Sequence, residues 1–184
     1  MPLIETPAGG GARGFRHWGR VLDALALVVL CFVAWKWFVA PRTLATKPVR
    51  PAPHVVYPLM RGGEFALAKA RGHVVFLDFW ASWCYPCKVE LPLVEHFARN
   101  HPPGVSVVEV DVGEPASVAA AYASAHGLTH VAFDPATISQ GYFQLSGFPT
   151  MVVIGPRGNI RATWRGLNPA IDLAMAHAVR KLSR

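Results

Sequence analysis

Two cysteines separated by two residues carry the chemistry that this sequence can perform. Cys84 and Cys87 stand where an apolar run of strand length meets a stretch of helical periodicity. Cysteines at positions i and i+3 of a first helical turn bring their sulfurs close enough to form a disulfide. The free N–H groups of a helix N-terminus favour thiolate, the attacking species, at the first sulfur. The pattern predicts thiol–disulfide exchange, with Cys84 attacking and Cys87 resolving.

A zinc site and a purely structural disulfide are the alternatives for this pair. Zinc needs two further ligands, and the sequence has no second cysteine pair. The candidate histidine pairs either face different sides of a helix or enclose a glycine that ends one; they are His96 with His101 and His126 with His130. A disulfide that closes so short a loop adds little stability. We therefore expect no metal and no cofactor besides a redox-active Cys84–Cys87 disulfide.

The elements that position the cysteines follow from hydrophobic patterning. Apolar, β-branched runs predict strands over 73–80, 105–112, 131–133, 150–154 and 159–165. Helical spacing predicts helices over 86–100 and 115–126, a helical turn over 138–145, and a last helix starting at Asn168-Pro169 with Asn168 as its cap. Gly155 to Gly158 has the composition of a hairpin turn. The order predicts a mixed α/β sheet with helices on both faces.

The N-terminal third has a different composition. Residues 21–40 are apolar around the whole helix, and the charged Asp23 and Lys36 lie near the two ends. We expect a transmembrane signal-anchor helix over 21–40, after a basic cytoplasmic segment, 1–20. A cleaved signal peptide or a buried core helix is the alternative. Residues 41–54 contain four prolines and predict an extended linker. A single domain, 55–184, follows.

The net charge of +7 is unevenly distributed. Residues 1–50 carry +5 and residues 51–184 carry +2, without a run of basic residues in the second part. Nucleic-acid binding is therefore not expected. Hydrophobic residues make up 52% and charged residues 16% of the chain, which excludes a disordered polyelectrolyte.

Two motifs together resemble a known family. The run from Phe79 to Pro92 and the tetrapeptide Gly147-Phe148-Pro149-Thr150 are similar to the active-site run and the cis-proline loop of the thioredoxin fold. More narrowly, they resemble the membrane-anchored TlpA/ResA/CcmG-like thiol–disulfide oxidoreductases of bacteria, over nearly all of 55–184. The resemblance implies a cis Phe148–Pro149 bond beside the cysteines. It also implies a substrate-binding surface formed by Trp83, Tyr85, Pro86, Phe148 and Pro149.

The resemblance also assigns two carboxyl groups. Asp78 matches the buried aspartate of thioredoxins that helps to move a proton, and Glu90 matches the active-site glutamate of the TlpA/ResA group. Both are expected catalytic residues, and which one handles the proton stays open. For Glu90 the alternative is a position on a solvated helix face. Gly166 resembles a family glycine that allows close approach near the site.

The function that the resemblance implies is disulfide reduction at the bacterial inner membrane, with the catalytic domain in the periplasm or extracytoplasmic space. Expected substrates are protein thiols and disulfides such as those of apocytochrome c. The expected electron donor is a membrane protein of the DsbD/CcdA type. Two alternatives stay open: an oxidase or isomerase of secreted-protein disulfides, and a non-catalytic copper-handling or interaction module on the same fold.

Overall fold

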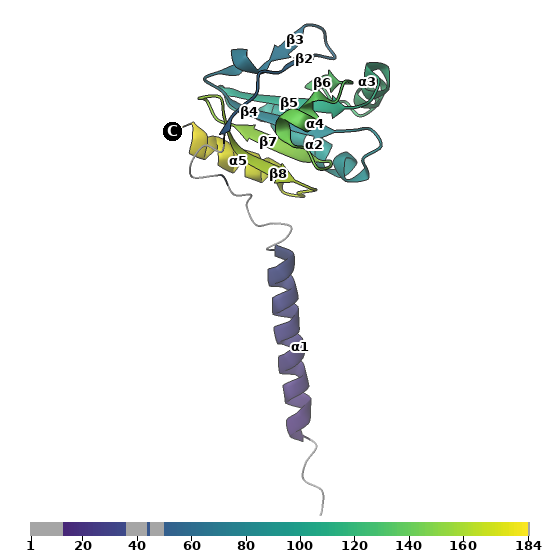
Figure 1. Cartoon of the computed structure of the whole chain (residues 1–184). Coiled ribbons are helices and arrows are strands. Elements are labelled where there is room, and N and C mark those ends of the chain that lie inside the picture. Colours follow the sequence, from purple (N-terminus) through teal and green to yellow (C-terminus); the bar gives the residue numbers. More distant parts are fainter. Residues whose placement is uncertain (1–12, 36–43, 45–49, 184) are drawn as a thin grey trace, which may run out of the picture. The chain divides into compact units, whose positions relative to one another are not determined.

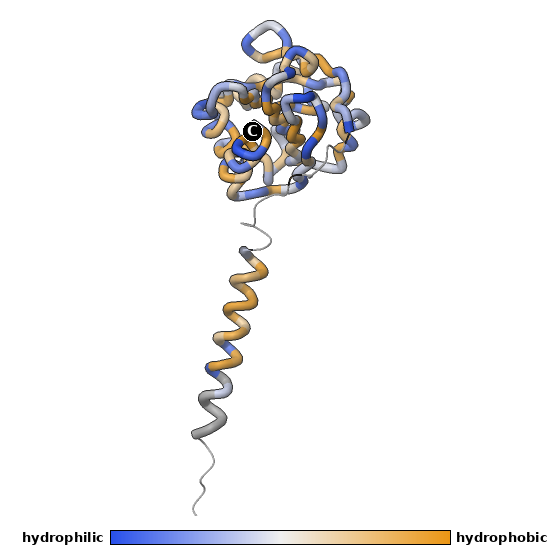
Figure 2. The backbone as a smooth tube through the Cα atoms, turned by 90° about the vertical axis from the view of Figure 1, so that its left-hand side faces the viewer, coloured by the Kyte–Doolittle hydropathy of each residue, from blue (hydrophilic) through white to orange (hydrophobic). Residues whose placement is uncertain are grey.

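The computed structural model of the chain describes residues 13–35, 44 and 50–183, which belong to two units divided after Ala40. The first unit contains helix α1 (Arg13–Ala34). Its described apolar side chains are exposed, and Figure 2 shows hydrophobic residues along much of the helix. Among the described residues, no helix has both the length and the hydropathy that a membrane crossing requires. Residues 36–40 of the predicted membrane segment lie outside the described residues.

The second unit is built on a sheet of six strands in the order β1-β8-β7-β4-β5-β6 (Figure 1). The strands of this sheet are β1 (Arg50–Pro51), β4 (Val74–Trp80), β5 (Val105–Val112), β6 (Val131–Asp134), β7 (Thr150–Ile154) and β8 (Asn159–Arg165). Strands β4, β5 and β6 are parallel, whereas β7, β8 and β1 continue the sheet antiparallel from β4. The predicted mixed sheet is therefore confirmed.

The remaining elements cover this sheet or extend it. They are β2 (Val56–Pro58), β3 (Glu64–Ala66), the 3-10 helix η2 (Leu67–Ala70), α2 (Tyr85–Asn100), α3 (Ala116–Ala125), α4 (Ile138–Phe143) and α5 (Ile171–Leu182). Strands β2 and β3 form a separate antiparallel hairpin. The two residues of β1 lie within the range expected to be a linker, and they pair with β8.

Strand β4 runs through the centre of the core, and all seven of its residues are buried. Successive residues of a strand point to opposite faces. Phe76 packs with residues of α2 and α5 on one face, and Leu77 packs with Phe143 of α4 on the other. Helices thus cover both faces, as the sequence pattern predicts. A third cluster, at the carboxyl end of β4, contains both cysteines and joins α2 to α3.

The start of α5 differs from the sequence prediction. The helix begins at Ile171 rather than at Asn168-Pro169, and its N-cap residue is Ala170. The Asn168 side chain accepts a hydrogen bond from the backbone N–H of Ala170 at 3.1 Å, so it closes a turn ahead of the helix. The backbone N–H of Asn168 donates a hydrogen bond to Oε2 of Glu90 at 2.6 Å. This long-range contact explains the difference, because it holds Asn168 in the loop.

Candidate active site

The cysteine pair forms a disulfide at the N-terminus of α2. Cys84 is the N-cap residue, and its Sγ accepts a hydrogen bond from the backbone N–H of Cys87 at 3.2 Å. Pro86 lies in the first turn, where its missing N–H leaves no bond unmade. Cys84 is 4% exposed and Cys87 is fully buried, in agreement with the predicted order. The N–H that caps the helix therefore also points at the sulfur expected to carry negative charge.

The loop before β7 lies against this pair. The Phe148–Pro149 peptide bond is cis, as the sequence resemblance implies. Phe148 packs against the cluster that contains Cys84 and Cys87, and its ring meets the ring of Trp83 edge-on, with centroids 5.9 Å apart. The Thr150 hydroxyl donates to the carbonyl of Gly147 at 2.7 Å, which closes the loop from within. The two predicted motifs thus meet in space.

Gly166 plays a different part from the one expected. Its backbone N–H donates to the carbonyl of Pro149 at 2.9 Å, which ties the end of β8 to the cis-proline loop. A Cβ atom at this position would meet no atom within 4 Å, so close approach does not require glycine here. Glycine is required instead by the backbone φ of +74°, because residues with a Cβ rarely adopt this angle.

Large exposed side chains surround the buried disulfide. Trp83 is 68% exposed and Tyr85 is 77% exposed, and Pro86 between the cysteines is exposed as well. Exposed aromatic groups beside a buried reactive bond provide apolar contact area for a docking chain. Four of the residues predicted to bind substrate, Trp83, Tyr85, Pro86 and Phe148, are at least partly accessible, and Pro149 is buried beneath them.

The two predicted carboxyl groups are buried between α2 and the sheet. Asp78, on β4, is 1% exposed, and neither of its oxygens has a hydrogen-bond partner. Burial raises the pKa of Asp78 well above its ordinary value, and the nearby Glu90 carboxyl adds to the rise. Glu90 is 2% exposed, which excludes the solvated helix face considered for it. It lies one turn after Cys87 on the buried side of α2, so both acids face the interior.

A carboxylate that the sequence analysis did not single out fixes the loop before Cys84. Glu114 accepts hydrogen bonds from the backbone N–H of Ser82 at 2.5 Å and from its hydroxyl at 2.7 Å. Burial alone would raise the pKa of Glu114, but these hydrogen bonds outweigh it and the pKa is lowered. The only sequence signal for this role was that Glu114 follows the carboxyl end of β5. Because neighbouring parallel strands end at the same edge of a sheet, a residue after β5 lies near the loop that follows β4.

Comparison with known proteins is consistent with this geometry. Residues 72–160 match a family model described as Thioredoxin-like. The thiol-disulfide oxidoreductase ResA of Geobacillus kaustophilus is 32% identical over 124 residues, which cover 66% of this chain and 71% of that protein. The ResA of Geobacillus thermodenitrificans is 30% identical over 155 residues, covering 83% of this chain and 88% of that protein. The chain belongs to the ResA-like thiol–disulfide oxidoreductases.

Solved structures of thioredoxin-family and related proteins share the fold. A thioredoxin-family thiol:disulfide interchange protein from Chlorobium tepidum superposes with a TM-score of 0.64 at 25% identity, covering 76% of this chain and 99% of that one. StoA from Bacillus subtilis superposes with a TM-score of 0.59 at 26% identity, covering 68% of this chain and 98% of that one. As in this ResA-like family, the redox group is the chain's own cysteine pair. Among the described residues, no group of three or more potential ligands is placed to hold a metal ion.

The stability of the protein should depend on pH through Asp111, which lies beside Glu114. Burial raises the pKa of Asp111 to about 8, and the neighbouring Glu114 carboxylate adds to the rise. An unfolded aspartate titrates near pH 4, so between about pH 4 and pH 8 the folded state binds more protons. Stability therefore falls as pH rises through this window.

We expect Asp111→Asn to remove this dependence. Urea unfolding at pH 5 and at pH 9 should show that the wild type loses about 1–3 kcal/mol more than Asp111→Asn between the two conditions, which is less than full linkage would give because solvent screens part of the interaction. Parallel stability curves for the two proteins would contradict the assignment.

Proposed function

We propose that this chain is a membrane-anchored disulfide reductase that acts on protein substrates outside the cytoplasm of a bacterium. The observation that carries the proposal is the buried Cys84–Cys87 disulfide, which lies beside a cis-proline loop under exposed aromatic side chains. Cys84 would be the attacking thiol, because it stands at the helix N-terminus and is the less buried of the two. Cys87, deeper in the core, would resolve the intermediate.

The exchange transfers two electrons from the cysteine pair to the substrate. The Cys84 thiolate attacks one sulfur of a substrate disulfide, that S–S bond breaks, and the departing thiolate takes up a proton. Cys87 then loses its thiol proton and attacks Sγ of Cys84. The mixed disulfide breaks, the second substrate thiolate is released, and the Cys84–Cys87 disulfide forms. The reduced substrate and the oxidised enzyme are the products.

Asp78 and Glu90 would hold the proton that Cys87 gives up. A buried thiol cannot lose its proton directly to water, so a nearby base must accept it. The raised pKa of Asp78, which burial and the Glu90 carboxyl cause, suits it to accept a proton near neutral pH. The Glu90 side chain is fixed by the backbone N–H of Asn168.

Anchoring and partners are part of the same proposal. The described apolar side chains of α1 are exposed, and the sequence continues with further apolar residues up to Ala40. Such a segment is stabilised by burial in lipid, which supports an anchor over 21–40. The resemblance to the membrane-anchored TlpA/ResA/CcmG-like proteins supports a catalytic domain in the periplasm. Apocytochrome c is the proposed class of substrate. A membrane donor of the DsbD/CcdA type would return two electrons to the oxidised pair.

Turnover should require Cys84 and not the third cysteine. We expect the full chain in detergent micelles to catalyse insulin reduction by dithiothreitol, and Cys84→Ser to lower the rate by about a hundredfold or more, because no thiolate remains at the attacking position. Cys31→Ser is the matched control, since Cys31 forms no disulfide and lies in α1. Equal rates for wild type and Cys84→Ser would refute the enzymatic function.

The direction of exchange depends on the reduction potential of the Cys84–Cys87 pair. We expect equilibration with glutathione or dithiothreitol buffers to give a value below about −200 mV, on the reducing side of protein disulfide isomerase. A value near −120 mV, about that of DsbA, would instead support an oxidase of secreted proteins.

Topology follows from the proposed anchor. Alkaline phosphatase, which folds only where disulfides form, should be active when fused after Arg184, whereas a fluorescent reporter that matures only in the cytoplasm should stay dark. The opposite pair of results would place the catalytic domain in the cytoplasm and refute the proposed location.

A further inference from the structure

Glu109 is a buried acid that the proposed exchange does not yet use. It lies on β5, is fully buried, and neither carboxyl oxygen has a hydrogen-bond partner. Leaving a polar group buried and unpaired destabilises the folded state, and a charged group does so more strongly. A natural core would ordinarily place an apolar residue at such a position, so Glu109 calls for a physical reason.

The register of the sheet places Glu109 beside Asp78. The two residues are direct partners in the parallel pairing of β4 with β5. Their strands lie roughly 4.7–4.9 Å apart, and paired residues of parallel strands point to the same face. That face is the one beneath α2, since Val107 on β5 packs there with residues of α2 and α5. The two unpaired acids are therefore neighbours under the helix that carries the cysteines.

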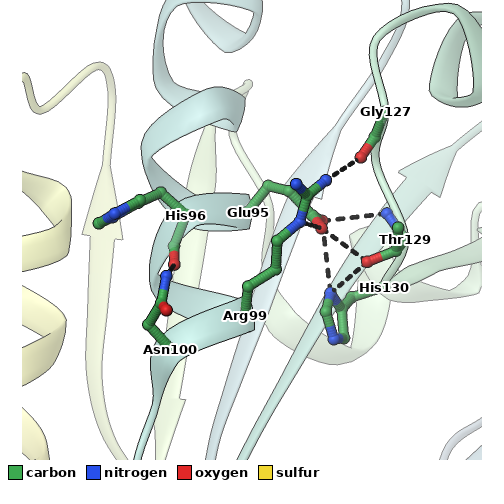
Figure 3. Close-up of polar contacts among 7 residues, drawn as sticks. All are labelled: Glu95, His96, Arg99, Asn100, Gly127, Thr129 and His130. Atoms are coloured by element: carbon green, nitrogen blue, oxygen red, sulfur yellow. Dashed lines mark hydrogen bonds and ion pairs between the residues drawn. The ribbon is translucent and has the colours of Figure 1, made fainter.

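Glu95 on α2 is the next acid, close enough for its charge to raise the pKa of Glu109, and Figure 3 shows the polar contacts that hold Glu95. It lies on the buried side of α2, and its carboxylate accepts hydrogen bonds from the Thr129 backbone N–H at 3.0 Å and the Thr129 hydroxyl at 2.6 Å. Arg99 Nε donates to the same carboxylate at 2.7 Å, and His130 Nδ1 lies 3.3 Å from it. Glu95 is thus a fixed anion between the interior and the surface.

The outer end of this row of acids reaches a cavity. The His130 side chain is 33% exposed, against 5% for Glu95. Thr129 and His130 line a cavity of about 340 Å³ together with Leu59, Arg61, Phe65, His101 and residues 105–108 and 131. This cavity lies where β6 has not yet begun to pair with β5, because the first pair is Glu109 with Val131. Water in the cavity can exchange protons with His130.

We propose that Glu109 carries protons between Asp78 and Glu95, so that Cys87 exchanges its proton with solvent at the His130 cavity. The inference rests on the proposed thiol–disulfide exchange. When Cys87 loses its proton, the Asp78 carboxylate accepts it. Glu109 passes a proton outward to Glu95, and Asp78 passes its proton to Glu109. Glu95 releases a proton through His130, so one proton leaves for each one that Cys87 gives up.

The charged groups around Glu109 fit this part. Burial raises its pKa well above the ordinary value, and the carboxylates of Glu95 on α2 and Asp78 on β4 raise it further, while Arg99 on α2 opposes them. Glu109 therefore holds a proton when its neighbours are ionised. Burial would raise the pKa of Glu95, but hydrogen bonds from Thr129, Arg99 and His130 outweigh it and lower the pKa to about 2. Glu95 thus releases any proton it receives at once.

The test separates the two steps of exchange. Reduced full-length protein in detergent is mixed with oxidised glutathione, and quenched-flow mass spectrometry follows the glutathione adduct of Cys84 as it forms and decays. We expect Glu109→Gln to form the adduct at the wild-type rate and to lose it at least tenfold more slowly at pH 7. The decay should be nearly independent of pH from 6 to 8 in the wild type. In Glu109→Gln it should rise with pH, since Asp78 must then lose the proton by a slower route that depends on hydroxide.

Matched variants distinguish a proton carrier from a structural residue. Glu109→Asp keeps a carboxyl group and should restore the flat pH profile. Asp134→Asn removes another buried carboxyl group, 3% exposed and hydrogen-bonded to the first turn of α4, and should leave both steps unchanged. If Glu109→Gln fails to fold, the same measurement is made on His130→Gln, at the partly exposed end of the proton path. We expect the adduct to decay at least threefold more slowly in this variant than in the wild type.

The outcomes of the proposal and of the proposed function are distinguishable. If the wild type forms no glutathione adduct, or Cys84→Ser forms it equally well, the proposed exchange itself is refuted. The other outcome is that the wild type forms and resolves the adduct, while Glu109→Gln (or His130→Gln in its place) shows the same decay rate and pH profile. In that case the exchange stands and the proton path is overturned.

Discussion

The hydrogen bond from the backbone N–H of Cys87 to Sγ of Cys84 links the chemistry to the fold. A side-chain acceptor at the N-cap stabilises a helix, and here the acceptor is the reactive sulfur itself. Every element around the site serves this arrangement: β4 delivers the cysteines to the start of α2, and Glu114 holds the preceding loop through Ser82. The start of α2 and the ionisation of Cys84 are therefore controlled by the same few backbone groups.

The face of the sheet beneath α2 carries more acidic side chains than a stable core requires. Asp78, Glu109 and Asp111 are all buried there, and burial raises the pKa of each. The opposite face, beneath α4, is lined by apolar residues of the same strands. This asymmetry is typical of proteins that give up stability for activity. The cost falls on the layer next to the cysteines, where proton-holding groups are useful.

Much of the fold could be predicted because the local signals agree with one another. The β-branched run of β4, the helical spacing of α2 and the Gly-Pro turn between β7 and β8 each predict one structure, and the resemblance placed Pro149 beside the cysteines. The start of α5 could not be predicted, since Glu90, 78 residues earlier, holds the Asn168 N–H. A local cap preference cannot anticipate such a contact.

The acids of β5 were missed for a related reason. Glu109 lies in a β-branched strand, and its importance depends on being level with Asp78 rather than on any local motif. Strand register is set by the packing of the whole sheet, which no short window of sequence contains. The role of Glu95 was missed for the same reason, because helical periodicity does not predict which residues a charged side chain on α2 will contact. Only the meeting of α2 with Thr129 and His130 shows why it is there.

The cis-proline loop is bonded to the sheet at both ends and within. Gly166 on the end of β8 holds the Pro149 carbonyl, the Thr150 hydroxyl holds the Gly147 carbonyl, and Phe148 rests on Trp83. A surface ordered in this way before any partner arrives loses little conformational entropy when a chain docks on it. A preformed surface of this kind favours partner chains that can adopt an extended conformation across the cis-proline loop. The conformational adjustment on docking then falls to the protein substrate rather than to the enzyme.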